Sequence, residues 1–402
     1  MTAETLDLTS AVLDHAFLEA VDPLVKLRAC IQCGTCSATC PTAYAMDYPP
    51  RLVWRRVQLG LRDEVLNSRT FWLCTTCKAC QVRCPRGIDL MDIMIALKEY
   101  AFGKDVGVPA GMKTFGDTVA NSYNISGDDN QNRQIWSQNL PRIPLGVQPR
   151  RKKAEVIYFL GCVSSFYPRV YSIPQALVQV MERAEVEFTT LGGDEWCCGY
   201  PLHIAGMGDR MRELAQHNVR VAREVGARRV VFTCPSCYYA WAHLYPEFVS
   251  PADLSGIQLQ HASEFMAELL TGNKVPLSPV QEVVTYHDPC DLGRKSGVYD
   301  APREVLARIP GLTFHEMSAS RENAMCCGGG GDVEVADHNV PGGVAARRLE
   351  QIQATGAKYV LSACQQCKRT LQEGARQNKV RVGAMDLTEL VWKSVQGASQ
   401  GS

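Results

Sequence analysis

The sequence predicts a multidomain protein in which a helical, cysteine-rich module is followed by two pseudo-symmetric α/β lobes. Three observations support this prediction. The chain has 402 residues, which is more than one hydrophobic core normally serves. Its 18 cysteines fall mostly into short, regularly spaced groups. The cysteine spacing after residue 153 also repeats, which indicates an internal duplication.

Composition divides the chain into four parts. Residues 1–102 hold eight cysteines, and residues 153–278 and 279–395 hold the two copies of the repeat, with five cysteines each. Residues 103–152 hold none and are rich in Gly, Asn, Gln and Pro, so we expect a linker or an extended arm there. A basic cluster at 150–153 fits a solvated hinge.

The secondary structure expected differs between the parts. Residues 50–62 and 89–100 show helical periodicity, so the first part is expected to be mostly helical. In each repeat, β-branched runs such as 156–160 and 283–286 alternate with helical stretches such as 209–225 and 344–355. This alternation predicts a parallel sheet with helices on its faces, and open sheets of this kind bind ligands where their strands end.

Two cysteine runs in the first part have the spacing C-x-x-C-x-x-C-x-x-x-C-P. In two-cluster ferredoxins the fourth cysteine of such a run binds the other cluster. The spacing therefore predicts two [4Fe–4S] cubanes with crossed ligands. One is held by Cys30, Cys33, Cys36 and Cys84, and the other by Cys74, Cys77, Cys80 and Cys40. Structural zinc is the alternative, although zinc sites normally use two C-x-x-C pairs rather than two complete runs.

Each repeat supplies a lone cysteine, a Cys-Cys-Gly and a C-x-x-C. The gaps are 34 and 35 residues in the first copy, and 35 and 36 in the second. An ordinary cubane needs four thiolates, so five imply an unusual cluster or a spare cysteine. Gly199 and Gly328, directly after each cysteine pair, indicate a sharp turn that brings both neighbours to one site.

This twin pattern resembles the catalytic subunit of heterodisulfide reductases, in a form fused to the ferredoxin-like module. The resemblance implies two noncubane [4Fe–4S] clusters that face each other across a disulfide-binding cleft. By position, the first would be held by Cys162, Cys197, Cys198, Cys234 and Cys237. The second would be held by Cys290, Cys326, Cys327, Cys364 and Cys367. Ordinary cubanes with a spare fifth cysteine remain the alternative.

Other residues near these cysteines suggest further roles. His287 precedes Cys290 by three residues, and His203 follows Cys198 by five. Either imidazole could tune a cluster or protonate a leaving thiolate, or His287 and Asp288 could merely cap a turn. The glycine run 328–331 could offer its amides to cluster sulfurs or let substrate approach. It lacks the context of a dinucleotide fingerprint, and no flavin or nicotinamide site is evident, so electrons must come from a partner.

Charge and hydropathy exclude several other classes. Forty-two basic residues balance 42 acidic ones, which gives no reason to expect nucleic acid. No run of 18 apolar residues occurs, and residues 1–10 lack the basic start of a secretory signal. We therefore expect a cytoplasmic protein within a redox complex, with membrane docking only through a partner.

The leading functional hypothesis is a disulfide (heterodisulfide) reductase subunit, an oxidoreductase that works within a complex. Electrons from a flavoprotein or another redox subunit would pass the two cubanes and reach the two noncubane clusters, which split the disulfide. The alternative resembles the iron–sulfur subunits of glycolate, lactate and anaerobic glycerol-3-phosphate dehydrogenases. In that case the chain only relays electrons from a flavin-dependent subunit toward quinone. An iron–sulfur scaffold for cluster assembly has little support.

Overall fold

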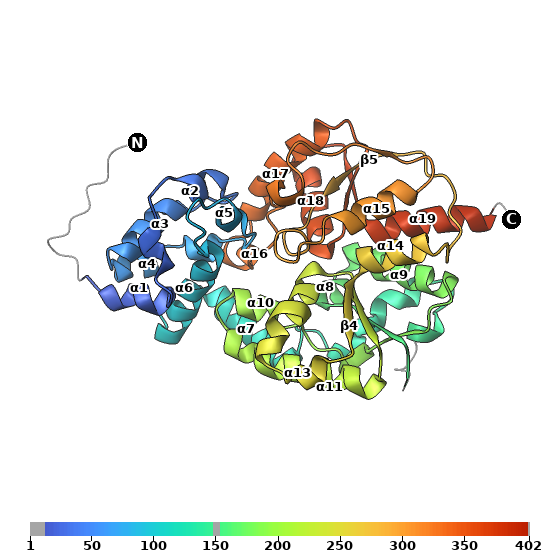
Figure 1. Ribbon diagram of the computed structural model, residues 1–402, viewed down its shortest axis with the longest axis horizontal. Helices are drawn as coiled ribbons and strands as arrows, with labels where there is room; N and C mark the ends of the chain where they lie inside the picture. Colours follow the sequence, from blue (N-terminus) through green and yellow to red (C-terminus); the bar gives the residue numbers. More distant parts are fainter. Residues whose placement is uncertain (1–12, 148–152, 401–402) are drawn as a thin grey trace.

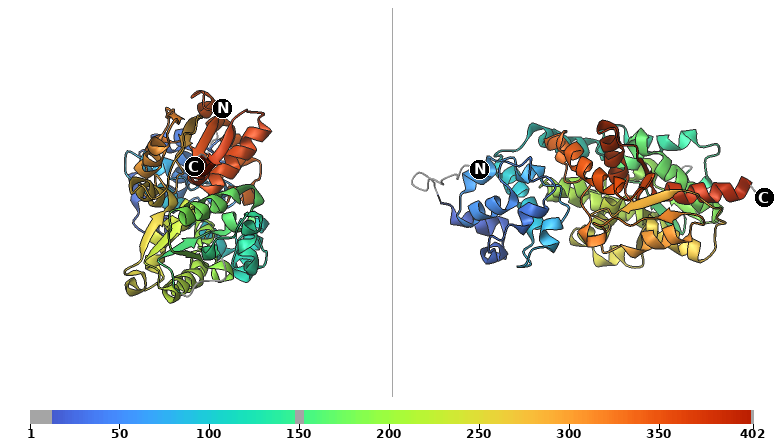
Figure 2. Two further views of the ribbon diagram at one scale, coloured as in Figure 1. Left: turned by 90° about the vertical axis from the view of Figure 1, so that its right-hand side faces the viewer. Right: turned by 90° about the horizontal axis from the view of Figure 1, so that it is seen from above.

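A computed structural model describes residues 13–147 and 153–400, and it contains a helical module and two α/β lobes (Figure 1). The helical module lies at one end of the long axis, and the lobes fill the other end, as the view from above also shows (Figure 2). The start of the chain, where no secretory signal is expected, and Arg150–Lys152 of the basic cluster lie outside the described residues. None of the helices in the described ranges is both long and apolar enough to cross a lipid bilayer.

The first module is helical, as predicted. Its core contains Trp54, Phe71, Trp72 and Leu97, all almost fully buried. The elements in order are α1 (His15–Val21), η1 (Lys26–Ala29), α2 (Thr35–Thr39), α3 (Pro50–Gln58), α4 (Arg62–Leu66), η2 (Phe71–Leu73), α5 (Ala79–Val82) and α6 (Leu90–Lys104). Pro50 occupies the first turn of α3, where its missing N–H leaves no intrahelical bond unmade.

The segment after the module is not an extended arm over its described residues. It forms α7 (Ala110–Ser122) and two 3₁₀ helices, η3 (Asn130–Asn139) and η4 (Leu145–Val147). One of its amide side chains holds it to the first lobe: Asn130 Nδ2 donates to the carbonyl oxygens of Gly193 and Glu195. Composition predicted a linker or an extended arm, but Trp136 of this segment is buried against the first lobe.

The two lobes have the same sheet topology. The strand orders are β2-β1-β3-β4 and β6-β5-β7-β8, and all pairs are parallel. The central strand β1 is buried at every position, as expected for a sheet covered on both faces. The strands are β1 (Val156–Phe159), β2 (Phe188–Thr190), β3 (Arg229–Phe232), β4 (Gln258–His261), β5 (Val283–His287), β6 (Thr313–Phe314), β7 (Tyr359–Ser362) and β8 (Gly383–Asp386).

Helices cover both sheets. Those of the first lobe are α8 (Cys162–Phe166), α9 (Ser172–Arg183), α10 (Tyr200–Ile204), α11 (Met211–Val225), α12 (Pro235–Tyr239), α13 (Pro251–Leu254) and α14 (Ala262–Thr271), with a π-helical turn at Ala240–Leu244. Those of the second lobe are α15 (Asp300–Arg308), α16 (Val333–Ala336), α17 (Val340–Gln353), α18 (Gln365–Gln377) and α19 (Leu387–Gln400). The predicted long helices are confirmed, and α19 runs past the expected limit of the lobe at 395.

The lobes join by exchanging their last helices. Helix α19 of the second lobe packs on α9 of the first, and α14 of the first packs on α15 of the second (Figure 1). One apolar core therefore includes residues of both sheets, such as Tyr158 and Tyr286. A second core joins the helical module to the first lobe, because Trp54 and Trp72 belong to the same cluster as Cys162 and Cys197. This packing fixes the cysteine groups relative to one another.

Candidate metal centres and the cavity between the lobes

All eighteen cysteines are free thiols that lie in groups without disulfides. In the helical module, Cys30, Cys33 and Cys36 line a small cavity together with Cys84 of the other run. Cys40 in turn lies beside the second run: burial, together with the nearby thiolates of Cys74 and Cys77, raises its pKa to about 12. The fourth cysteine of each run therefore lies with the first three of the other, which is the grouping that crossed ligation requires.

Sharp turns in the lobes bring neighbouring cysteines to one place. Gly199 and Gly328 have φ of +79° and +97°, a region that side chains disfavour. Each turn is closed on a sulfur, since the Gly199 amide donates to Cys197 Sγ and the Gly328 amide to Cys326 Sγ. The turn predicted from the glycine after each pair is therefore confirmed.

The remaining lobe cysteines follow the strand ends. Cys162 begins α8 after β1, Cys234 caps α12 after β3, and Cys364 caps α18 after β7. Nine of the ten lobe cysteines line one cavity between the lobes, with a volume of about 180 Å³. The nine are Cys162, Cys197, Cys198, Cys234, Cys237, Cys290, Cys327, Cys364 and Cys367. All five thiols of the first set and four of the second thus meet at one cavity, and such thiol groups fit soft, thiolate-bound iron–sulfur clusters.

The tenth cysteine, Cys326, faces the helical module instead. It packs in one cluster with Cys77 of the second ferredoxin run and with Cys290. A hydrogen bond between the two sulfurs lowers the pKa of Cys77 well below its usual value. The second ferredoxin group and the second lobe group are therefore in direct contact through sulfur.

A buried ion pair supports the first lobe group. Arg133 Nη1 lies 3.0 Å from Glu195 Oε1, and both side chains are fully buried. The Glu195 oxygens also accept the backbone amides of Leu160 and Gly161, both at 2.8 Å. Arg133 donates from Nη2 to Cys162 Sγ at 3.4 Å. The ion pair therefore holds the loop that carries Cys162, and its guanidinium group donates a hydrogen bond to the Cys162 sulfur.

The second lobe group has a different polar environment. His287, Cys327 and Cys367 are buried with their potential ligand atoms within 4.8 Å of one another. Arg348 Nε donates to His287 Nδ1 at 3.2 Å, and Arg348 Nη2 has no hydrogen-bond partner in the described part of the chain. His287 therefore lies beside the sulfurs of Cys327 and Cys367 without lining the cavity.

Neither histidine named from the sequence lies on the cavity wall. Among the described residues that line the cavity there is no histidine at all. Burial lowers the pKa of His203 to about 4, so this imidazole is neutral at pH 7. The expectation that His203 or His287 protonates a leaving thiolate therefore has no geometric support, whereas His287 keeps its place beside Cys327.

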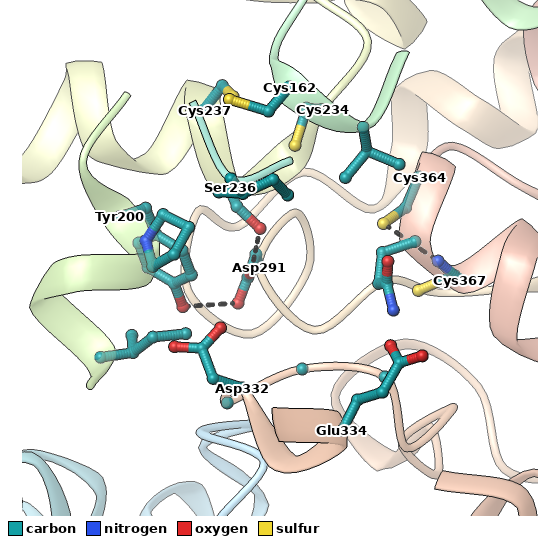
Figure 3. Close-up of a pocket in the computed structure, with 18 of the residues that line it drawn as sticks. Cys162, Tyr200, Cys234, Ser236, Cys237, Asp291, Asp332, Glu334, Cys364 and Cys367 are labelled. Atoms are coloured by element: carbon teal, nitrogen blue, oxygen red, sulfur yellow. Dashed lines mark hydrogen bonds between the residues drawn. The ribbon is translucent and has the colours of Figure 1, made fainter. Parts of the chain in front are cut away.

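Acidic and hydroxyl side chains line the cavity instead (Figure 3). Asp291 accepts hydrogen bonds from Tyr200 Oη at 3.2 Å and from Ser236 Oγ at 2.6 Å, and it pairs with Lys295 at 2.7 Å. Asp332 lies across from these groups and points toward them. These contacts tie the C-x-x-C loop of the first lobe to the loop after Cys290 in the second.

The glycine run forms the junction with the helical module. Gly330 and Gly331 line the cavity and pack against the backbone of Thr75 and Cys74, where a side chain would clash. Lys98 on α6 is buried and donates to the carbonyl oxygens of Ile204 and Gly331, one in each lobe. The close approach expected of these glycines is therefore to the ferredoxin-type module.

Four residues at these sites escape sequence reasoning: Arg133, Lys98, Asp332 and Arg294. Arg133 lies in the apparent linker, and Lys98 is one basic residue on a helix, so neither has a motif. Arg294 donates to the carbonyl oxygens of Cys77 and Ala324, which no spacing indicates. Of these four residues, only Asp332 lies next to a recognisable sequence feature, because it directly follows the four-glycine run.

Comparisons with known proteins agree with this arrangement. A family model described as a 4Fe-4S dicluster domain matches residues 26–88, and one described as a cysteine-rich domain matches residues 156–241 and 284–372. The chain is 31% identical to a subunit of the dihydromethanophenazine:CoB–CoM heterodisulfide reductase of Methanosarcina barkeri, over 94% of this chain and 96% of that protein. This chain belongs to the family of that heterodisulfide reductase subunit. It is thus an iron–sulfur oxidoreductase subunit of heterodisulfide reductase type.

Other relatives of this heterodisulfide reductase-type subunit are named as different oxidoreductases. The probable iron-sulfur-binding oxidoreductase FadF of Bacillus subtilis is 29% identical over 89% of the chain and half of its own length. The EtfAB:quinone oxidoreductase of Syntrophomonas wolfei is 25% identical over 93% of the chain and 59% of its own. A solved structure of a hypothetical protein from Helicobacter pylori shares the fold, with a TM-score of 0.56 over 95% of the chain at 12% identity.

Proposed function

We propose that this chain reduces a disulfide in the cavity between its lobes, with electrons that enter through the helical module. The observation that carries the proposal is the single cavity lined by nine of the ten lobe cysteines. The Methanosarcina relatives are named for the CoB–CoM heterodisulfide. For this chain we propose the chemical class, a disulfide of two thiols, as the substrate.

The cysteine groups determine which clusters we propose. Two cubanes would be held in the module by Cys30, Cys33, Cys36 and Cys84, and by Cys74, Cys77, Cys80 and Cys40. Each five-cysteine lobe set would hold one noncubane [4Fe–4S] cluster, because a cubane has no use for a fifth thiolate. Such clusters supply electrons one at a time to the substrate sulfur. The protein residues hold the disulfide, exclude water and deliver protons.

The proposed electron route follows the sulfur contacts. Cys33 is exposed, so a flavoprotein or other redox partner can approach the first group there. The second group touches the second lobe through Cys77 and Cys326. Electrons would therefore reach the second lobe set first, and the first lobe set from across the cavity.

An electron relay is the second candidate, and the relative named EtfAB:quinone oxidoreductase favours it. In this alternative a flavoprotein partner oxidises its own substrate and the chain passes the electrons toward quinone. The lobe cavity would then have no substrate. Both candidates use the same clusters, so only turnover in the cavity separates them.

The test uses the full chain with its clusters loaded under anaerobic conditions. Reduced methyl viologen should be oxidised by a panel of symmetrical and mixed thiol disulfides, with two electrons consumed and two thiols formed per disulfide. Cys234→Ser, which removes one cavity thiolate and leaves the module intact, should still accept electrons from viologen but reduce no disulfide. No turnover with any disulfide, together with only cubane signals in magnetic spectroscopy, would leave the relay as the function.

A further inference from the structure

Among the described acids that line the cavity, Asp332 is the one with a buried carboxyl oxygen that has no hydrogen-bond partner. It follows the glycine run and begins α16. Although the residue as a whole is half-buried, its Oδ2 atom is fully buried and has no hydrogen-bond partner. An unpaired buried carboxylate is costly, so such a group holds a proton more tightly than usual. Burial accordingly raises the pKa of Asp332 to about 7, against the opposing charge of Lys98.

The other charged groups around the cavity are already paired. Asp291 uses both of its oxygens, for Tyr200, Ser236 and Lys295. Glu334 is bound by Arg369. Lys98 donates to two carbonyl oxygens and forms no ion pair with Asp332. The charge of Lys98 on α6 acts on the Asp332 carboxyl. Tyr200 on α10 and Asp291 in the loop after Cys290 lie across the cavity from Asp332, and Lys295 is bound to these two residues (Figure 3).

We propose that Asp332 is the acid that protonates one substrate sulfur as the disulfide breaks. The inference rests on the proposed function. The S–S bond accepts two electrons from a one-electron donor, reduced viologen in the assay, and breaks into two thiolates. One thiolate takes the proton of the Asp332 carboxyl and leaves as a thiol. The other leaves the cavity and takes its proton from water, and Asp332 regains a proton through its exposed side.

No other side chain of the described cavity wall fits this role as well. Histidine is missing from the wall, and His203 is neutral at pH 7. Tyr200 donates to Asp291 and also contacts Lys295, and its pKa lies well above its usual value because of burial, so it holds its proton firmly. Asp332 combines a protonated state near pH 7 with a position inside the cavity (Figure 3).

The experiment compares Asp332→Asn with Asp337→Asn in the cluster-loaded full chain. Asp337 is a carboxylate of the same segment that pairs with Arg69 and does not line the cavity. Loss of a general acid typically costs 10²- to 10⁴-fold in rate, so Asp332→Asn should lower viologen-driven disulfide turnover by about 10²-fold at pH 6.5. Asp337→Asn should retain turnover, and both variants should keep the iron content.

The pH dependence gives a second readout. The acid is active only when protonated, so wild-type turnover should fall about tenfold between pH 6 and pH 8. Asp332→Asn should lose this slope, and Asp332→Glu should restore part of the rate together with a slope. Infrared difference spectra of the wild type should show a carboxylic C=O band that titrates near pH 7 and that Asp332→Asn lacks. The variant is needed for the assignment because burial also raises the pKa of Asp386 to about 7. This readout needs no turnover.

The outcomes separate the two proposals. Unchanged turnover and slope in Asp332→Asn, or no titrating carboxylic band in the wild type, would overturn the role of Asp332 alone. Failure of the wild type to reduce any disulfide would overturn the proposed function and the inference with it.

Discussion

The buried pair of Arg133 and Glu195 beside Cys162 gives a prediction with a calculable pH signature. Arg133→Met leaves the Glu195 carboxylate without a cation in a fully buried site. The variant avoids an unpaired charge by protonating Glu195, whose pKa burial already raises above its ordinary value of 4.5. The free energy of unfolding then falls by the work of protonation, about 1.4 kcal/mol for each pH unit above 4.5.

The magnitude follows from these values. The work is about 2 kcal/mol at pH 6 and about 5 kcal/mol at pH 8, and the second value reaches the range of about 3–5 kcal/mol for broken buried ion pairs. An unfolding entropy of about 2.1 cal/mol/K per residue over the whole chain converts this to about 2 °C and about 6 °C in Tm. In the single variant the pKa of Glu195 is higher in the folded state than in the unfolded state, and this sets the direction of the pH dependence. The stability is retained at low pH and is lost as the pH rises.

The double variant Arg133→Met/Glu195→Gln is the control. It loses the same hydrogen bond to Cys162 but needs no proton, so its Tm should change little between pH 6 and pH 8. Calorimetry of the cluster-loaded proteins measures the difference in Tm between the single and the double variant at pH 6 and at pH 8. A gap of the same size at pH 6 and pH 8 would refute the reasoning, because it would mean that Glu195 does not take up a proton.

Three further predictions concern the module and the second lobe. Gly331→Ala should slow electron transfer into the lobes at unchanged iron content, because the methyl group would overlap the module backbone. Gly356→Ala, at a similar positive φ but with open space around it, is the control for stopped-flow reduction. Cys84→Ser should remove the magnetic signal of the cluster at Cys30, Cys33 and Cys36. Cys40→Ser should remove that of the cluster at Cys74, Cys77 and Cys80, and the reverse result would contradict crossed ligation. His287→Gln should shift the reduction potential of the second lobe cluster in a redox titration and leave the pH slope of turnover intact; a lost slope would reassign the proton donor.

The sequence alone determined the local chemistry. Two complete ferredoxin runs and two spaced sets of five cysteines predict the clusters, because ligand spacing is a local property of the chain. Alternation of β-branched runs with helical stretches predicts two α/β lobes, and the glycines after Cys198 and Cys327 predict the turns that the structure contains. The turns and the three-residue steps of the cysteine runs are specified by residues that are close together in the chain.

Only the tertiary structure decided how the groups meet. Helices α14 and α19 each pack on the other lobe, nine of the ten lobe cysteines meet at one cavity, and no sequence pattern indicates which helix packs on which lobe. The contact between Cys77 and Cys326, and the pairing of Arg133 with Glu195, join positions far apart in the chain. The burial that raises the pKa of Asp332 likewise depends on the helical module and both lobes together. Packing between distant segments is physically non-local. Composition therefore predicted a linker or an extended arm at 103–152, whereas Trp136 of this segment is buried against the first lobe and Phe115 and Ile125 line the cavity.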